Sequence, residues 1–166
     1  MRRPRVLVLP ALPESALARL SEFADLMRVI VCDPFLPEAT HTLPALLGEA
    51  DVASLHVPLT AETRGFFGSA EFGAMRPGAI YLNTSRGALH DLRALVDALR
   101  WGQVGGAGLD HFEGEWLDRA HPLTRLPNVV LTPRLGDATG ESRDELAETL
   151  VEDIARQLRG EDQVPA

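Results

Sequence analysis

Ala79-Ile80-Tyr81-Leu82-Asn83, followed by Thr84-Ser85-Arg86-Gly87, is the stretch that decides the fold. The mostly apolar first part predicts a strand covered on both faces, and the polar second part marks its end. Strand-like runs of the same kind lie before and after it, at Val52–Leu55 and Gly105–Asp110. Near-continuous apolarity in successive short runs favours a parallel sheet.

The rest of the chain continues this alternation of strands and helices. The predicted strands are Arg5–Leu9, Arg28–Cys32, Val52–Leu55, Ala79–Asn83, Gly105–Asp110 and Val129–Leu131. The predicted helices are Glu14–Ala24, Leu43–Glu49, Ala70–Met75 and Leu92–Arg100, with Asp91 as an N-cap and Gly102 as a stop. This βαβ rhythm is typical of an α/β, Rossmann-like doubly wound parallel sheet.

A last helix is predicted over Glu141–Arg159, and its apolar residues recur every fourth position on one face. The stripe consists of Leu146, Leu150, Ile154 and Leu158. An apolar face of this kind needs a partner. It could fold back on the N-terminal βα unit, but that short unit offers little surface for so long a helix, so the sequence predicts a homo-oligomer.

Length and charge narrow the class of protein. The chain has 166 residues, which favours one well-buried domain, and a net charge of −8, which argues against nucleic-acid and anionic-membrane partners. Its apolar runs are too short for a signal-peptide core or a membrane span, so we expect a cytoplasmic protein. The single cysteine, Cys32, excludes an internal disulfide, and no histidine pair has metal-ligand spacing.

Polar side chains gather where the predicted strands end. In an open α/β sheet these ends meet at one crevice, so Asp33, Asn83–Arg86, Asp110 and Thr132–Arg134 are expected to converge there. Asp33 suits the hydroxyls of an adenosine ribose, but Asp33-Pro34 is equally good turn chemistry. The fork of donors on Arg86 suits a carboxylate, and Glu115 could orient a neighbouring proton carrier.

With these motifs the chain resembles the D-isomer-specific 2-hydroxyacid dehydrogenases, and specifically their NAD-binding domain, from about Met27 to Gly160. Several motifs in the right order carry the resemblance: Arg28 to Pro34, Ala50-Asp51-Val52, His56-Val57-Pro58-Leu59-Thr60 with Thr63, Met75 to Ala79, Asn83 to Gly87, Asp110, and Pro127 to Pro133.

The resemblance implies NAD as cofactor and a small 2-hydroxy or 2-oxo acid as substrate. It implies that Arg86 holds the substrate carboxylate and carbonyl, that Glu115 pairs with the acid/base residue, and that Asp110 contacts the nicotinamide end. Asp33 and Pro34 would lie at the adenosine ribose. The remaining cofactor cleft would be lined by Val57, Pro58, Thr63, Thr84, Ser85 and Gly136.

The sequence departs from the family pattern at three places. The acid/base histidine of the family falls at Arg134, and arginine keeps its proton at any physiological pH. The glycine-rich turn is absent, because Leu9–Ser15 places proline and bulk there. Finally, Arg5–Ala24 resembles the start of the family's substrate domain, joined directly to the nucleotide domain.

We therefore expect a shortened member with three parts: residues 1–26 as a substrate-domain remnant, 27–140 as the NAD-binding domain, and 141–166 as the C-terminal helix and tail. Impaired or lost catalysis, with weakened NAD binding, is the first hypothesis. A working oxidoreductase that uses an unusual acid, such as His111, or a partner chain is a second hypothesis, and a non-catalytic oligomerising interaction module is a third. The other histidines are expected to be structural.

Overall fold

The computed structural model describes residues 30–35, 37, 39, 41–114, 117–136, 140, 147–148 and 151. The chain forms two compact units, residues 1–133 and residues 134–166, and each is described by itself. The strand predicted at 5–9 and the helix predicted at 14–24 lie outside the described residues. The predicted three-part division stays a prediction.

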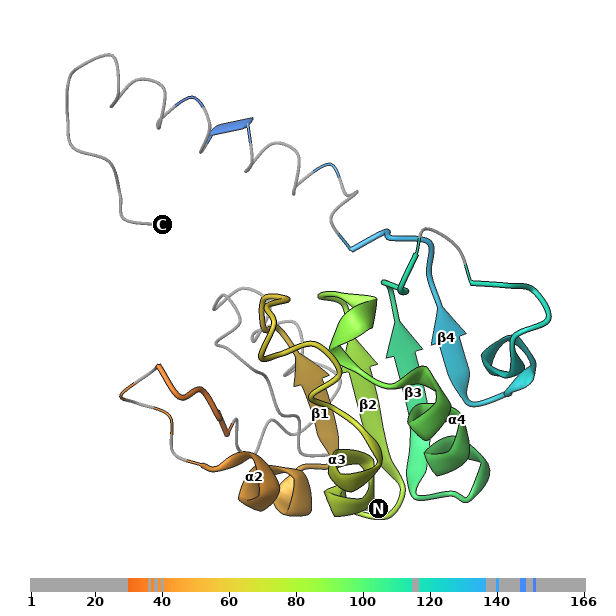
Figure 1. The fold of residues 1–166 in the computed structure, drawn as a ribbon, viewed down its shortest axis with the longest axis horizontal. Coiled ribbons are helices and arrows are strands. Elements are labelled where there is room, and N and C mark those ends of the chain that lie inside the picture. Colours follow the sequence, from red (N-terminus) through yellow and green to blue (C-terminus); the bar gives the residue numbers. More distant parts are fainter. Residues whose placement is uncertain are drawn as a thin grey trace. The chain divides into compact units, whose positions relative to one another are not determined.

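In the first unit, the described residues form a four-stranded parallel sheet with the order β1-β2-β3-β4. The strands are β1 (Val52–Leu55), β2 (Ala79–Asn83), β3 (Val104–Leu109) and β4 (Val129–Leu131). Figure 1 shows all four arrowheads pointing toward the same edge. The predicted α/β parallel sheet is thereby confirmed.

The strand bounds agree closely with the sequence pattern. β1, β2 and β4 have the predicted bounds, whereas β3 starts and ends one residue earlier than predicted, so that Asp110 follows the strand. Residues 30–32, the described part of the strand predicted at 28–32, do not form a strand. The carbonyl of Val31 nevertheless accepts a hydrogen bond of 3.2 Å from the backbone N–H of His41.

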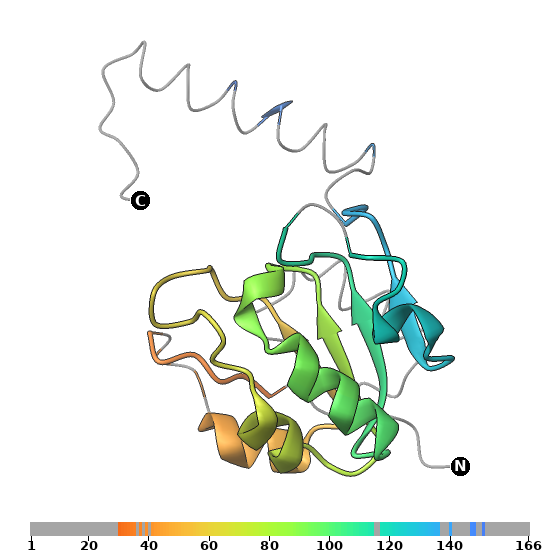
Figure 2. The same ribbon diagram turned by 45° about the vertical axis from the view of Figure 1, so that its right-hand side comes forward.

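The described residues form three α-helices in this unit, which pack around the sheet: α2 (Leu43–Glu49), α3 (Ser69–Ala74) and α4 (Leu92–Arg100). Asp91 caps α4 as predicted, since its carboxylate accepts hydrogen bonds from the backbone N–H groups of Arg93 and Ala94. Gly102 follows the helix with a φ of +75°, which confirms it as the stop. Figures 1 and 2 show α3 and α4 on one face of the sheet.

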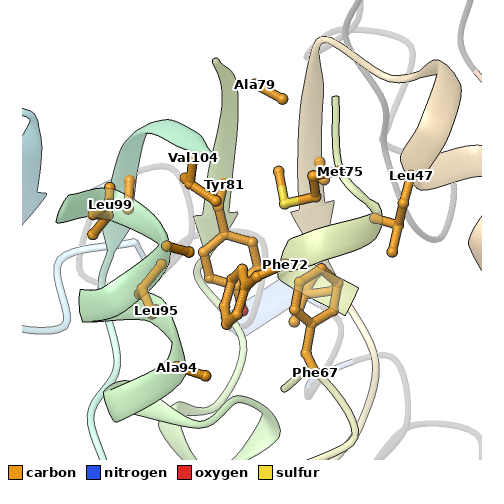
Figure 3. Packing of buried hydrophobic residues seen from close by; sticks show 14 of the residues in the cluster. Leu47, Phe67, Phe72, Met75, Ala79, Tyr81, Ala94, Leu95, Leu99 and Val104 are labelled. Carbon is orange, nitrogen blue, oxygen red and sulfur yellow. The ribbon is translucent and has the colours of Figure 1, made fainter. Parts of the chain in front are cut away.

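An aromatic cluster joins these helices to the middle of the sheet (Figure 3). The rings of Phe67 and Phe72 lie 5.0 and 5.1 Å from the ring of Tyr81 on β2, measured between centroids, and all three residues are buried. Leu95 and Leu99 of α4 belong to the same core. This packing fixes β2, and therefore the loop that leaves its carboxyl end.

Little of the second unit is described. Residues 140, 147, 148 and 151 are helical, but the four residues of the predicted apolar stripe lie outside the described part. Among the described residues, no helix is long and apolar enough to cross a membrane.

Candidate functional site

The carboxyl ends of the four strands lie in one register. Leu55 pairs with Asn83, Asn83 with Leu109, and Leu109 with Leu131. The residues that follow these positions, among them Asp110, therefore line a single edge of the sheet. This is the edge at which an open α/β sheet binds its ligand, and the β2, β3 and β4 ends converge on it as predicted.

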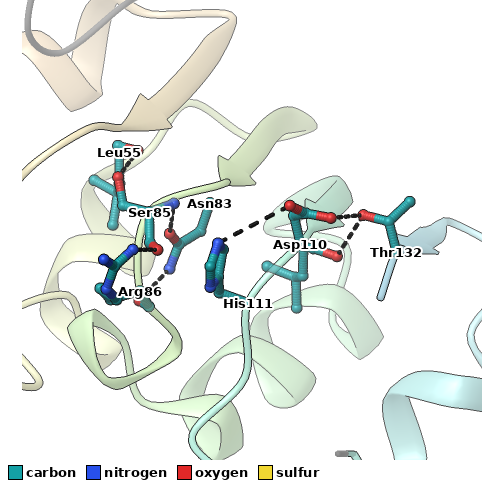
Figure 4. Close-up of polar contacts among 8 residues, drawn as sticks. Leu55, Asn83, Ser85, Arg86, Asp110, His111 and Thr132 are labelled. Atoms are coloured by element: carbon teal, nitrogen blue, oxygen red, sulfur yellow. Dashed lines mark hydrogen bonds and ion pairs between the residues drawn. The ribbon is translucent and has the colours of Figure 1, made fainter. Parts of the chain in front are cut away.

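Asn83 organises the β2 end of this edge (Figure 4). Its side chain is fully buried, and its amide nitrogen donates to the carbonyl of Arg86 at 3.0 Å and contacts Nδ1 of His90 at 2.8 Å. Its carbonyl oxygen accepts from the backbone N–H of Ser85 at 3.0 Å. One buried amide thus holds three positions of the following chain, which fixes the path of the loop.

Arg86 is an exposed residue on this fixed loop. Its Nη1 donates to the carbonyl of Ser85 at 2.8 Å, and the Ser85 hydroxyl donates to the carbonyl of Leu55 at 3.0 Å, which ties the loop to β1. A side chain at Gly87 would overlap the backbone of Phe112 and Glu113. The guanidinium therefore projects from a loop that is held on both sides.

A groove of about 580 Å³ runs between the β1 and β2 ends, lined by residues 56–59 and 84–86. Val57, Pro58 and Leu59 give it an apolar wall, while residues 84–86 supply polar groups. Thr63 supports the apolar wall, because its hydroxyl donates to the carbonyl of Pro58 at 2.7 Å. Nε2 of His56 shares a hydrogen bond of 2.8 Å with the Ser54 hydroxyl, and burial lowers the pKa of His56.

Asp110 dominates the β3–β4 end of the edge. The residue is only 3% exposed, and its carboxylate accepts a hydrogen bond from the hydroxyl of Thr132 and lies 4.0 Å from Nε2 of His111. The backbone N–H of Thr132 donates to the carbonyl of Leu109 at 3.0 Å, so the same residue also joins β4 to β3. A buried carboxylate is costly unless it is hydrogen-bonded, and these partners offset that cost.

The other predicted site residues divide into three groups. Asp33 forms the turn that its sequence allowed, since its carboxylate accepts from the backbone N–H of Phe35 at 2.8 Å, with Pro34 exposed beside it. Its role at a ribose stays a prediction. Glu115 lies outside the described residues. Arg134, which has a φ of +57°, and Gly136 are exposed residues of the second unit.

Several residues of this edge were not predicted as site residues. In the sequence, Asn83 starts a motif and His90 has the context of a structural residue, yet both hold the Arg86 loop. The signal for Asn83 was available, because an asparagine at a strand end before Thr-Ser is a turn former. Thr132 and His56, at the ends of β4 and β1, belong to predicted motifs, but these contacts were not predicted.

A larger hollow of about 700 Å³ lies along α4, and its lining differs from that of the groove. That lining carries three arginines and three acidic residues: Arg64, Arg93, Arg100, Asp91, Asp97 and Glu113. Arg64 and Glu113 form an ion pair of 2.8 Å, so the hollow has no excess of either charge. Although this hollow is larger than the groove, the residues at the ends of the strands do not line it.

A parallel sheet with polar residues at its carboxyl ends is the arrangement in which open α/β domains, nucleotide-binding domains among them, bind their ligands. Residues 15–136 match the family described as D-isomer specific 2-hydroxyacid dehydrogenase, NAD binding domain. The chain belongs to this family, which confirms the predicted resemblance.

Relatives and solved structures agree with that assignment. The chain is 47% identical over 116 residues to a glyoxylate reductase of Thermococcus litoralis, covering 70% of this chain and 35% of that protein. It resembles the crystal structure of the TT0316 protein from Thermus thermophilus with a TM-score of 0.78 and 40% identity, covering 97% of this chain and 52% of that one.

An NAD-complexed D-isomer specific 2-hydroxyacid dehydrogenase from Lactobacillus delbrueckii ssp. bulgaricus gives a TM-score of 0.80 at 29% identity, covering 96% of this chain and 54% of that one. The chain thus spans about a third of the length of the curated relative, with 35% covered, and about half of these solved chains, with 52% and 54% covered.

Proposed function

We propose that this chain binds NAD in the crevice and presents Arg86 to the carboxylate of a small 2-oxo or 2-hydroxy acid, with impaired or lost catalysis. One observation carries the proposal: the loop fixed by Asn83 projects Arg86 at the same sheet edge as the 56–59 groove and Asp110. The family membership supports the cofactor.

The chemistry of this edge fits a dinucleotide. The apolar wall of Val57, Pro58 and Leu59 suits a flat ring, and the polar groups at residues 84–86 offer donors for sugar and phosphate oxygens. Asp110 offers an acceptor for an amide at the other end. When bound, the reduced cofactor would supply a hydride to the carbonyl carbon of a 2-oxo acid.

The proton that must accompany this hydride has no ordinary donor at the family position. Arg134 stands there, and a guanidinium does not release its proton to a developing alkoxide. General acid catalysis contributes about 10²–10⁴-fold to rates. His111, 4.0 Å from the Asp110 carboxylate, is the alternative donor.

Calorimetric titration with NADH tests the binding proposal. The wild type should bind, and Val57→Glu should weaken binding at least about tenfold, because it places a carboxylate in the groove that would receive a phosphate-bearing ligand. Val130→Glu is the matched control, since Val130 on β4 is 66% exposed. A wild type that binds no NADH would contradict the proposal and favour the interaction module.

We further propose that the chain assembles as a homo-oligomer through the stripe of Leu146, Leu150, Ile154 and Leu158. Their fourfold spacing supports this, because an apolar face favours association. Light scattering over a range of concentrations should detect a dimer or a larger species. A strict monomer at every concentration would refute this part.

We also propose that the protein works in the cytoplasm, where its net charge of −8 suits a small-molecule enzyme domain. Fractionation of the producing cells, with detection by an antibody, tests this location. Recovery in the membrane or secreted fraction would contradict it.

A further inference from the structure

His90 is a buried partner of the Arg86 loop. The residue is 5% exposed, and its Nδ1 lies 2.8 Å from the amide nitrogen of Asn83. The orientation of the Asn83 amide follows from its backbone partners, because the nitrogen faces the Arg86 carbonyl and the oxygen faces the Ser85 N–H. Nδ1 of His90 must therefore accept, which places the ring proton on Nε2.

The core holds the His90 ring in place. The ring lies edge-on to Tyr81, with 5.5 Å between centroids, and Tyr81 packs against Phe67 and Phe72. A backbone bridge joins His90 to Phe67, and the N–H of His90 donates to the carbonyl of Gly87 at 3.4 Å. The acceptor nitrogen is thus fixed by the aromatic cluster rather than by the exposed loop.

Desolvation keeps this ring in the accepting form. Burial lowers the pKa of His90 to about 4, although the neighbouring Asp91 carboxylate acts in the opposite direction. At neutral pH the imidazole is therefore uncharged. A protonated ring would present an N–H to the Asn83 amide, and two donors would face each other.

We propose that His90 is a positioning residue: its neutral imidazole holds the Asn83 amide, and Asn83 in turn holds the backbone of Ser85 and Arg86 so that the guanidinium faces the ligand carboxylate. The chain of contacts runs from the aromatic core through His90 and Asn83 to the loop. The carboxylate part of this inference rests on the proposed function, whereas the hold on the loop does not.

Nitrogen-15 NMR of the wild-type protein tests the tautomer directly. At pH 6 the His90 ring should be neutral, with its proton on Nε2. A charged ring, or a proton on Nδ1, would overturn the proposal without any substitution being made. This measurement therefore stands even if a variant fails to fold.

Amide hydrogen exchange then tests the hold on the loop. His90→Leu removes the acceptor, so the Ser85 amide should exchange roughly tenfold faster, while the Ala107 amide in β3 is unchanged. His90→Asn restores an acceptor near the position of Nδ1 and should return Ser85 exchange toward wild type. Equal Ser85 exchange in His90→Leu and wild type would overturn the proposal.

The functional arm measures binding of oxamate, a 2-oxo-acid analogue, to the NADH-loaded protein. His90→Leu should weaken oxamate binding about tenfold, because the loop that carries Arg86 is loosened. Equal oxamate affinity in wild type and His90→Leu would overturn the proposal. If the wild type binds no NADH, the proposed function fails, and the Ser85 exchange rates still decide the role of His90.

Discussion

The two ends of the crevice are built in different ways. At the β1–β2 end, neutral groups bond to one another: the Asn83 amide, the His90 ring and the Ser85 hydroxyl fix the loop that carries Arg86. At the β3–β4 end, a buried carboxyl group, that of Asp110, is held by Thr132 with His111 nearby. The β1–β2 end is suited to holding the ligand-binding loop in place. Reduction of a 2-oxo acid would need a proton carrier at the β3–β4 end.

Turnover with glyoxylate would most strongly contradict this difference between the two ends, because it would require a working proton carrier. We expect no measurable NADH oxidation with glyoxylate, pyruvate or hydroxypyruvate, since loss of a general acid alone costs about 10²–10⁴-fold. The measurement is absorbance of NADH in the presence of each acid, on a sample whose NADH binding has been titrated.

Two variants sharpen that prediction. Arg134→His alone should not restore turnover, because Leu9–Ser15 still lacks the glycine turn for the phosphates. If the wild type turns over and His111→Gln abolishes that turnover, His111 is the proton carrier. Turnover at about 1–10³ s⁻¹, the range of ordinary enzymes, would show that catalysis is intact.

The neutral character of the β1–β2 end predicts a pH-dependent stability. His90 has a pKa of about 4 in the folded protein, below the ordinary value of 6.5 expected when unfolded. Between these values the unfolded chain binds the extra proton, so the free energy of unfolding falls as pH falls from 6.5 to about 4. Over this whole pH range, the shift of the His90 pKa lowers the free energy of unfolding by about 3 kcal/mol.

Urea unfolding at several pH values measures this slope. His90→Asn should flatten it, because the variant has no group at this position that titrates in that range. His56 contributes in the same direction, since burial lowers its pKa as well, so part of the slope should remain. An unchanged slope in His90→Asn would contradict the neutral, buried ring.

A substitution at Gly87 tests the close packing of the loop without removing any of its side-chain hydrogen bonds. Gly87→Ala should lower the free energy of unfolding by about 1–3 kcal/mol, because the new methyl group would overlap the backbone of Phe112 and Glu113. Gly73→Ala is the control, since a Cβ at Gly73 in α3 meets nothing within 4 Å. The control should be neutral or stabilise by up to about 1 kcal/mol. Equal effects on thermal unfolding would rule out the close contact at Gly87.

The elements of this fold were easier to predict from sequence than the contacts at its edge. Apolar runs located β1, β2 and β4, and the cap at Asp91 with the stop at Gly102 located α4, because these signals are local. The Asn83–His90 contact was not predictable, since His90 follows the apolar Ala88-Leu89 and has the pattern of a core residue. The role of His90 depends on which atom its buried ring faces, and the tertiary packing alone determines that.

The smallest effect we predict belongs to Thr132 at the β3–β4 end. Thr132→Val keeps the shape of the side chain but removes the hydroxyl that donates to Asp110, so the free energy of unfolding should fall by about 1 kcal/mol at neutral pH. Thr132→Ser keeps the hydroxyl and should recover most of that loss. Chemical unfolding of the two variants measures the difference, and equal stability of Thr132→Val and the wild type would mean that the Asp110 carboxylate is stabilised by other groups.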